Sequence, residues 1–406
     1  MTNATPALLA LLLVLSLPAT TLVAADVGDG MHSEPATSLQ ETDHATPTDI
    51  ENTTNRLELL DPVQNEYTES SVDFGATLAG GDDELRIDHE RYVGIDRDFA
   101  EADDEERAEI LDEAHAALGE RIETLYEREQ TAVREHANGE RTGDELRRTL
   151  LRNYHEATAL LSVLDYLELR ANEVPNYSLS SAQVREDTRS LEIHRSPIQS
   201  QLAGTSQNIG TTDRFQFLIQ TSADGYRLST IDGSNYVSET TRFDNYDPTA
   251  PDQFSERSAP EYAGSLYPWA ESEGSLAYTE AGRIHDVEFS DNHFSVRMFI
   301  DGGSGAVHRE IQELSTTSLP IVHEETHEVD GLELERRETP ANGPVELTVT
   351  DGSSAVESVT IEIGEHVVGE TDEDGRLWYV PPDSSYELTV TPAGEDEGST
   401  VDVSNL

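Results

Sequence analysis

The sequence predicts a multidomain α+β protein with an N-terminal helical hairpin or small bundle, a central α+β domain on an antiparallel sheet, and a C-terminal β-sandwich. Apolar residues recur at three- and four-residue steps between about residues 103 and 174, which is the helical period. From residue 204 to 340, apolar and polar residues alternate, and Asp-Gly pairs separate the runs. Residues 341–406 hold short alternating runs with a turn signal about every eight to twelve residues, a spacing typical of a sandwich.

Two long helices organise the first folded part, and we expect them over about 103–137 and 143–174. Gly139 suits the left-handed position just after the first helix. Thr142 and Glu145 have the spacing of a capping box, which begins the second helix. A short turn between two long amphipathic helices makes them pack antiparallel, so we expect a hairpin whose apolar stripes form its core.

Shorter segments complete the helical region, which we place at residues 57–203. The segments over 70–92 and 180–191 are amphipathic and can add helices to a small bundle. Ser196 and Pro197 begin another short helix, with Ser at the N-cap and Pro at the first helical position.

The central domain, residues 204–340, alternates strands with one helix. The runs that favour strands are residues 215–221, 226–231, 235–243, 285–290, 293–300 and 306–314. A helix is expected over Ala259–Ala270, and Pro268 should kink or end it. Tyr262 and Trp269 lie on one face of this helix, so one hypothesis places a ligand pocket, as in an extracellular sensor, beside them.

The C-terminal stretch from 344 to 403 contains, in order, "VTD", "VTIEIG", "GETDEDGRLWYVPP" and "YELTVTPAG". With this pattern it resembles the carboxypeptidase-regulatory-like and Cna-B-like β-sandwich modules. In those families the module is a stalk or accessory domain, so the resemblance implies a role without catalysis. The segment Asp372–Gly375 favours a turn, and a Ca²⁺ site is the alternative.

The composition indicates a high-salt habitat. The chain carries 82 acidic and 26 basic residues, a net charge of −56, and every basic residue is Arg. Such a charge destabilises a compact state by self-repulsion, and molar salt screens it by shortening the Debye length to about 3 Å. The charge argues against nucleic acid and anionic membranes as partners. The absence of Cys from the sequence excludes disulfides and thiolate chemistry.

The first 25 residues predict export. The apolar run Ala7–Leu17 has the length of a signal-peptide core, small residues follow it, and an uncleaved anchor is the alternative. Residues 26–56 are rich in Thr, Asp, Glu and Pro and predict a solvated, disordered linker. Asn52 and Asn176 stand in glycosylation sequons, which suits an extracellular chain. No later segment is apolar enough to cross a membrane.

Larger parts of the chain resemble an uncharacterised group of haloarchaeal exported proteins. The stretches that carry this resemblance are "YRLSTIDGSNYVSETTRFDN", "LYPWA" and "RMFIDGGSGAVHREIQEL". Members combine a signal sequence, a helical region, an α+β domain and a terminal sandwich. The resemblance therefore implies an architecture and a location, and it implies no activity.

The motif His323-Glu324-Glu325-Thr326-His327 has the H-E-x-x-H spacing of zinc peptidases. Such a site needs a helix that presents both His on one face, with Glu324 as general base. Here the flanking residues favour a strand, and Asp330-Gly331 signals a hairpin turn. In a strand the two His would lie about 13 Å apart, too far to share one zinc ion.

We therefore expect a non-catalytic exported protein with a binding or envelope-structural role, no cofactor, and an unknown envelope or extracellular partner. A zinc metallopeptidase using His323, Glu324 and His327 is the alternative. The remaining candidates for a metal site, His285, His293 and His308, are scattered over expected strands and favour ordinary surface or core positions.

Overall fold

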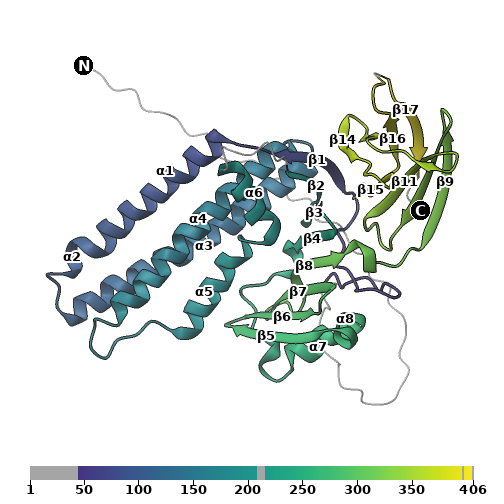
Figure 1. Cartoon of the computed structure of the whole chain (residues 1–406). Coiled ribbons are helices and arrows are strands. Elements are labelled where there is room, and N and C mark those ends of the chain that lie inside the picture. The colour runs from purple at the N-terminus through teal and green to yellow at the C-terminus, as the bar shows by residue number, and fades with distance from the viewer. Residues whose placement is uncertain (1–43, 208–214, 396, 405–406) are drawn as a thin grey trace, which may run out of the picture. The chain divides into compact units, whose positions relative to one another are not determined.

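Helices dominate the chain up to residue 207 and strands dominate after it (Figure 1). The computed structural model describes residues 44–207, 215–395 and 397–404, which belong to one unit that begins at His44. The expected signal segment, residues 1–25, lies outside the described residues. The helices are α1 (Phe74–Arg91), α2 (Arg97–Phe99), α3 (Asp104–Ala137), α4 (Gly143–Ala171), α5 (Ser181–Ile193), α6 (Pro197–Gln207), α7 (Ala259–Leu266) and α8 (Pro268–Glu273), with a π-helical turn η1 (Tyr92–Asp96) and 3₁₀ turns η2 (Phe243–Asn245), η3 (Gln253–Ser255) and η4 (Thr316–Ser318).

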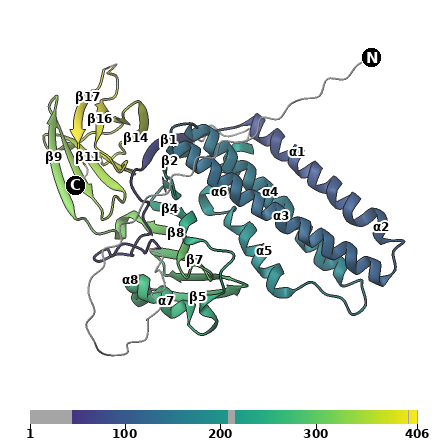
Figure 2. The ribbon, with the colours of Figure 1, turned by 180° about the vertical axis from the view of Figure 1, so that it is seen from behind.

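The long helices α3 and α4 form the expected antiparallel hairpin (Figure 2). Capping boxes begin both helices, at Asp103 for α3 and at Thr142 for α4. Gly139 follows α3 with a φ of +71°, a left-handed conformation that glycine adopts without strain. Their facing stripes are buried and include Leu111, Leu118, Leu125, Leu160, Leu164 and Leu167.

Helix α1 packs on the hairpin in an unexpected orientation. Its largest apolar side chains face solvent, with exposed fractions of 62% for Phe74, 74% for Leu78 and 71% for Leu85. The buried side of α1 holds Ile87 and the charged Asp83, whose carboxylate accepts a 2.6 Å hydrogen bond from α4. Polar contacts therefore decide which face of α1 meets the bundle.

An eight-stranded antiparallel sheet forms the central domain, in the order β1-β2-β3-β4-β8-β7-β6-β5. Its strands are β1 (Gln64–Ser70), β2 (Phe215–Ser222), β3 (Gly225–Asp232), β4 (Asn235–Arg242), β5 (Ser275–Ala281), β6 (Ile284–Ser290), β7 (Phe294–Asp301) and β8 (Val307–Ser315). Successive residues of β2 point to different cores. Phe217 and Ile219 pack with the hairpin and α6, whereas Leu218 packs with α7 and α8. Helices thus cover both faces of the sheet.

Two sheets make the C-terminal β-sandwich. One has the order β12-β11-β10-β9 with β15 beside β11, and the other has the order β14-β13-β16-β17. The strands are β9 (His323–Val329), β10 (Leu332–Glu338), β11 (Val345–Asp351), β12 (Ser354–Ala355), β13 (Thr360–Ile363), β14 (His366–Glu370), β15 (Arg376–Tyr379), β16 (Tyr386–Thr391) and β17 (Ser399–Val403). The expected turn at Asp372 is present, because its carboxylate accepts from the backbone N–H groups of Asp374 and Arg376, both at 2.9 Å.

Two expected boundaries are wrong. The linker expectation for residues 26–56 fails over 44–56, because Asn55 and Arg56 are buried and Asn55 donates to the Leu266 carbonyl at 2.8 Å. The sandwich begins at β9 and not at residue 341, because β9 and β10 pair with each other and β10 pairs with β11. Strand pairing is non-local, so composition alone did not reveal either junction.

Strand β1 also departs from the expected division, since it lies within the predicted helical region yet pairs with β2 along its whole length. In the described part of the chain, no helix is both long and apolar enough to span a membrane.

Candidate functional site

The zinc-motif residues lie on β9, the edge strand of the first sandwich sheet. Asp330 and Gly331 have φ values of 48° and 86°, which form the tight turn into β10. Glu324 is held by Arg337 at 3.1 Å and is therefore not poised over a shared metal position. Among the described residues, no three His, Asp or Glu side chains form a group that could hold a metal ion. His323 and His327 thus occupy the strand that their neighbours indicate.

The other candidate residues have ordinary surroundings. His285 contacts Tyr278 and Asp252, and His293 lies in the turn between β6 and β7. Trp269 packs against Phe294 with ring centroids 4.8 Å apart and joins the core below α7 and α8. Tyr262 is partly buried against the same core, so the two aromatic residues of the expected pocket serve packing.

Both sequon asparagines are accessible. Asn52 and Asn176 have exposed side chains and left-handed backbone conformations, with φ values of 65° and 62°. Exposed turns of this kind can be reached by a glycosylation enzyme.

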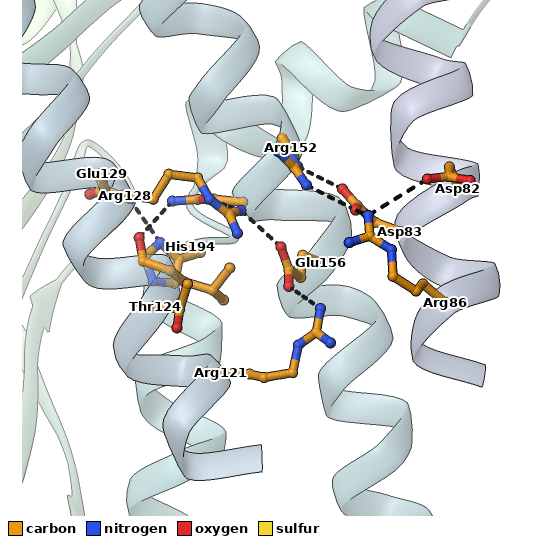
Figure 3. A network of polar contacts seen from close by, with 12 residues as sticks. Asp82, Asp83, Arg86, Arg121, Thr124, Arg128, Glu129, Arg152, Glu156 and His194 are labelled. Atoms are coloured by element: carbon orange, nitrogen blue, oxygen red, sulfur yellow. Dashed lines mark hydrogen bonds and ion pairs between the residues drawn. The ribbon is translucent and has the colours of Figure 1, made fainter. Parts of the chain in front are cut away.

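A seam of buried carboxylates and guanidinium groups ties the helices together (Figure 3). Glu156 on α4 accepts hydrogen bonds from Arg121 at 2.6 Å and Arg128 at 2.8 Å, both on α3. Burial favours a raised pKa for Glu156, but these hydrogen bonds outweigh it and lower the pKa below its usual value. Asp83 is paired in the same way with Arg152. Every charge in this seam is compensated, so it is a structural feature.

A second buried cluster lies where α3 meets the sheet. Glu129 of α3 accepts from His194 Nδ1 at 2.8 Å (Figure 3). It also accepts from the Tyr226 hydroxyl at 2.7 Å. Arg309 of β8 approaches the same carboxylate at 4.0 Å. Burial favours a raised pKa, but His194 and Arg309 overcome it and lower the pKa of Glu129 to about 2. The carboxylate is therefore ionised at neutral pH.

Glu239 of β4 extends this cluster to the start of α6. Its carboxylate accepts from Ser196 Oγ at 2.5 Å and from the Ile198 backbone N–H at 2.6 Å, and Arg309 lies 3.5 Å away. Ser196 stands at the expected N-cap position, since α6 begins at Pro197 and the Ser196 carbonyl accepts from the Ser200 backbone N–H at 2.8 Å. Its hydroxyl, however, donates to Glu239, and the carboxylate of this strand residue caps the Ile198 N–H in its place. Burial raises the pKa of Glu239 above its usual value.

A cavity of about 510 Å³ lies beside the Glu129 cluster, between α3, α5 and the start of β8. Its volume falls within the range of about 300–1,000 Å³ that is common for small-molecule sites. The polar and aromatic side chains that matter most in its lining are Tyr126, Glu186, His194, Phe243, Tyr246 and His308.

Aromatic rings build one wall of this cavity. The ring centroids of Tyr126 and Tyr246 are 4.9 Å apart, as are those of Tyr246 and His308. Tyr126 also meets Phe243 edge-on at 5.5 Å. The rings come from α3, from the turn after β4 and from β8, so the wall exists only in the folded chain.

Two imidazoles line the cavity, and in each ring Nδ1 is already hydrogen-bonded. His308 Nδ1 donates to the Arg242 carbonyl at 2.8 Å, and His194 Nδ1 bonds to Glu129. Neither Nε2 has a hydrogen-bond partner within the described residues. Ser190 also lines the cavity, but its hydroxyl makes no hydrogen bond to His194 in the described chain. Ser190 thus lacks, in the described chain, the contact with a base that would activate its hydroxyl as a nucleophile.

A larger cavity of about 760 Å³ lies between the sheet and the sandwich. Its charged lining residues include Arg337 and Glu346, which pair with each other at 3.0 Å. Polar contacts cross the same junction, such as the hydrogen bond from the Tyr67 hydroxyl to the Val380 carbonyl at 2.6 Å. We regard this cavity as part of the junction between the two domains, because residues of both line it and polar contacts cross it.

Three family comparisons cover nearly the whole chain. The family described as "Domain of unknown function (DUF7096)" matches residues 1–213, which is 213 of the 406 residues. The chain belongs to this family. The "Family of unknown function (DUF7094)" matches residues 217–320, and the "Archaeal fibronectin-III type-like domain" matches residues 323–399. No curated protein matches the chain.

These matches agree with an archaeal protein that ends in a β-sandwich. The terminal module, whose strand pattern resembles carboxypeptidase-regulatory-like domains, matches a fibronectin-III-like domain instead. The predicted β-sandwich is therefore confirmed, but the module matches a different sandwich family from the one that its strand pattern resembles. The matched range begins at His323, the first residue of β9.

The residues of the cavity and its cluster were missed by sequence reasoning, with one partial exception. The sequence points to His308 only as a histidine that favours an ordinary surface or core position, with a metal ligand as the alternative. Glu129 carried a usable signal, because it falls between Leu125 and Ala132 on the buried stripe of α3. A charged residue on an apolar stripe indicates a buried partner. That signal does not name His194, since the partner lies 65 residues away.

Proposed function

We propose that this protein is an exported, non-catalytic binding protein of a halophilic archaeon, which holds a small ligand in the cavity between α3, α5 and β8. The single observation that carries the proposal is this cavity, with its aromatic wall and its imidazole nitrogen free to accept a hydrogen bond. The fibronectin-III-like sandwich suits a spacer or attachment module at the cell surface. The apolar run near the N-terminus and the extreme acidity support export into a high-salt medium.

The location can be tested because the sequence contains no Cys. Ser353 lies in an exposed turn of the sandwich, so Ser353→Cys should react with a membrane-impermeant maleimide on intact cells. Ser229 is buried in the central sheet, and Ser229→Cys is the matched control that should react only after denaturation. Labelling of the Ser353→Cys protein only after cell lysis would contradict export.

Binding can be tested separately on the purified protein in molar KCl. Small amines, acids and neutral compounds are added in turn. At least one of these three classes should shift the NMR signals of His308. If no compound of any class shifts these signals, the cavity is not a ligand site and the proposed binding role is wrong.

A zinc peptidase remains the alternative function. The placement of His323 and His327 on a strand weighs against it, because their side chains cannot converge as they do on a helix.

A further inference from the structure

Resting on the proposed function, we propose that the cavity selects a protonated primary amine with an apolar body. The cavity combines aromatic faces, an imidazole acceptor and carboxylates without a lining Arg. Acidity is general in this chain, so the sign of the lining charge alone would be weak support. The argument depends on how the aromatic and acceptor groups are placed.

The acceptor is His308 Nε2. The residue is 5% exposed, and its Nδ1–H donates to the Arg242 carbonyl. A carbonyl can only accept, so Nδ1 carries the proton and Nε2 of the neutral ring offers a lone pair. Burial lowers the pKa of His308, which keeps the ring neutral near pH 7. A ligand that fills this position must therefore donate a hydrogen bond.

The aromatic wall favours a cation. Tyr126, Tyr246 and the His308 ring meet at centroid distances of 4.9 to 5.9 Å. The faces of tyrosine rings attract ammonium groups, more strongly where water is excluded. The apolar lining residues Ile193 and Ile284 offer a surface for the body of the ligand.

A half-buried carboxylate supplies the counter-charge. Glu186 of α5 lines the cavity, and burial raises its pKa above the usual value. The Arg283 backbone N–H donates to Glu186, which lowers its pKa less than burial raises it. The guanidinium of Arg283 acts on Glu186 only at a distance, because it donates to the backbone carbonyls of Asp247 and Ala250. An incoming ammonium group would compensate this carboxylate. Because the chain contains no Lys, none of its own side chains supplies such a group.

The test compares three ligands of matched shape: phenethylamine, its N,N,N-trimethyl derivative, and 3-phenylpropionate. Each is titrated by NMR into the whole protein in molar KCl. Phenethylamine should bind at least tenfold more tightly than the trimethyl compound, which has no N–H to donate, and 3-phenylpropionate should not bind.

Variants locate the effect within the cavity. His308→Asn keeps an amide donor for the Arg242 carbonyl and removes the Nε2 acceptor, so it should weaken phenethylamine about tenfold and leave the trimethyl compound unchanged. Glu186→Gln should weaken both cations. Glu120→Gln, exposed on α3 outside the cavity lining, is the control and should change neither affinity.

Two failures can be told apart. If the trimethyl compound or 3-phenylpropionate binds as tightly as phenethylamine, the cavity is a binding site but the amine inference is overturned. If none of the three ligands binds, the amine inference is also overturned, and the test with small amines, acids and neutral compounds then decides whether the proposed binding role survives.

Discussion

Replacing Glu310 with glutamine should remove a pH dependence from the stability of the central domain. Glu310 lies on β8 and is fully buried. Its Oε2 accepts from the Leu57 backbone N–H at 2.9 Å and from the Tyr267 hydroxyl at 2.5 Å. Among the described residues, its Oε1 has no partner. The Glu310 carboxylate therefore binds the segment around Leu57 to the sheet, although only one of its two oxygens has a hydrogen-bond partner in the described part of the chain.

The size of the effect follows from the pKa. Burial outweighs the two hydrogen bonds and raises the pKa of Glu310 from 4.5 to about 7. Because the folded pKa exceeds the unfolded one, the folded state binds the proton more tightly between these values. The contribution to stability is complete below about pH 4.5 and is lost as the pH rises through about 7. One pKa unit corresponds to about 1.4 kcal/mol, so the loss is about 3 kcal/mol.

The assay is urea unfolding in molar KCl at several pH values between 4.5 and 8. Trp269 reports the central domain in a Trp378→Phe background, since the chain has two Trp. The free energy of unfolding of Glu310→Gln, relative to the parent, should rise by about 3 kcal/mol across this range. Glu313→Gln, with an exposed side chain on the same strand, is the control and should show a flat difference. A flat difference for Glu310→Gln as well would refute the reasoning.

Three further outcomes test the packing and the motif. Leu85→Ala should change the free energy of unfolding by less than about 0.5 kcal/mol because Leu85 is exposed, whereas Ile87→Ala should cost about 2 kcal/mol or more because Ile87 is buried. Thermal unfolding measures both losses, and equal losses would mean that α1 is packed differently. Glu129→Gln should cost about 3 kcal/mol in urea unfolding, because it removes the charge partner of His194 and one of the two carboxylates beside Arg309, and a loss below about 1 kcal/mol would contradict that role. Elemental analysis should find no stoichiometric zinc in the parent or in His323→Ala, and zinc that disappears with the substitution would establish the peptidase alternative.

The sequence predicted the elements whose signals are local. The capping box at Thr142, the left-handed Gly139 and the Asp330-Gly331 turn each depend on a few adjacent residues, and each is present. The strand position of the H-E-x-x-H motif followed from the same kind of signal. The local pattern of "SLAYTEA" does not indicate strand β5, because its place at the sheet edge is fixed by pairing with β6.

The candidate site could not be predicted from the sequence either, because it too depends on contacts between residues far apart in the chain. His308 stood out in the sequence only as a histidine, and its role depends on a carbonyl 66 residues away and on rings from two other elements. The sandwich boundary likewise depended on the pairing of β10 with β11. Contacts between distant residues leave no periodic trace in a single sequence.

The sequence by itself determined the three-part architecture, the two long helices with their caps, and the acidic, Lys-free composition, because each follows from residue content or from spacing within a few residues. Only the tertiary structure decided that Leu78 and Leu85 of α1 face outward while Asp83 faces the bundle. Only the fold gathered Glu129, His194 and the cavity beside them. In both cases a buried charge took its place according to its partner on another element, and the local pattern of apolar residues could not specify that partner.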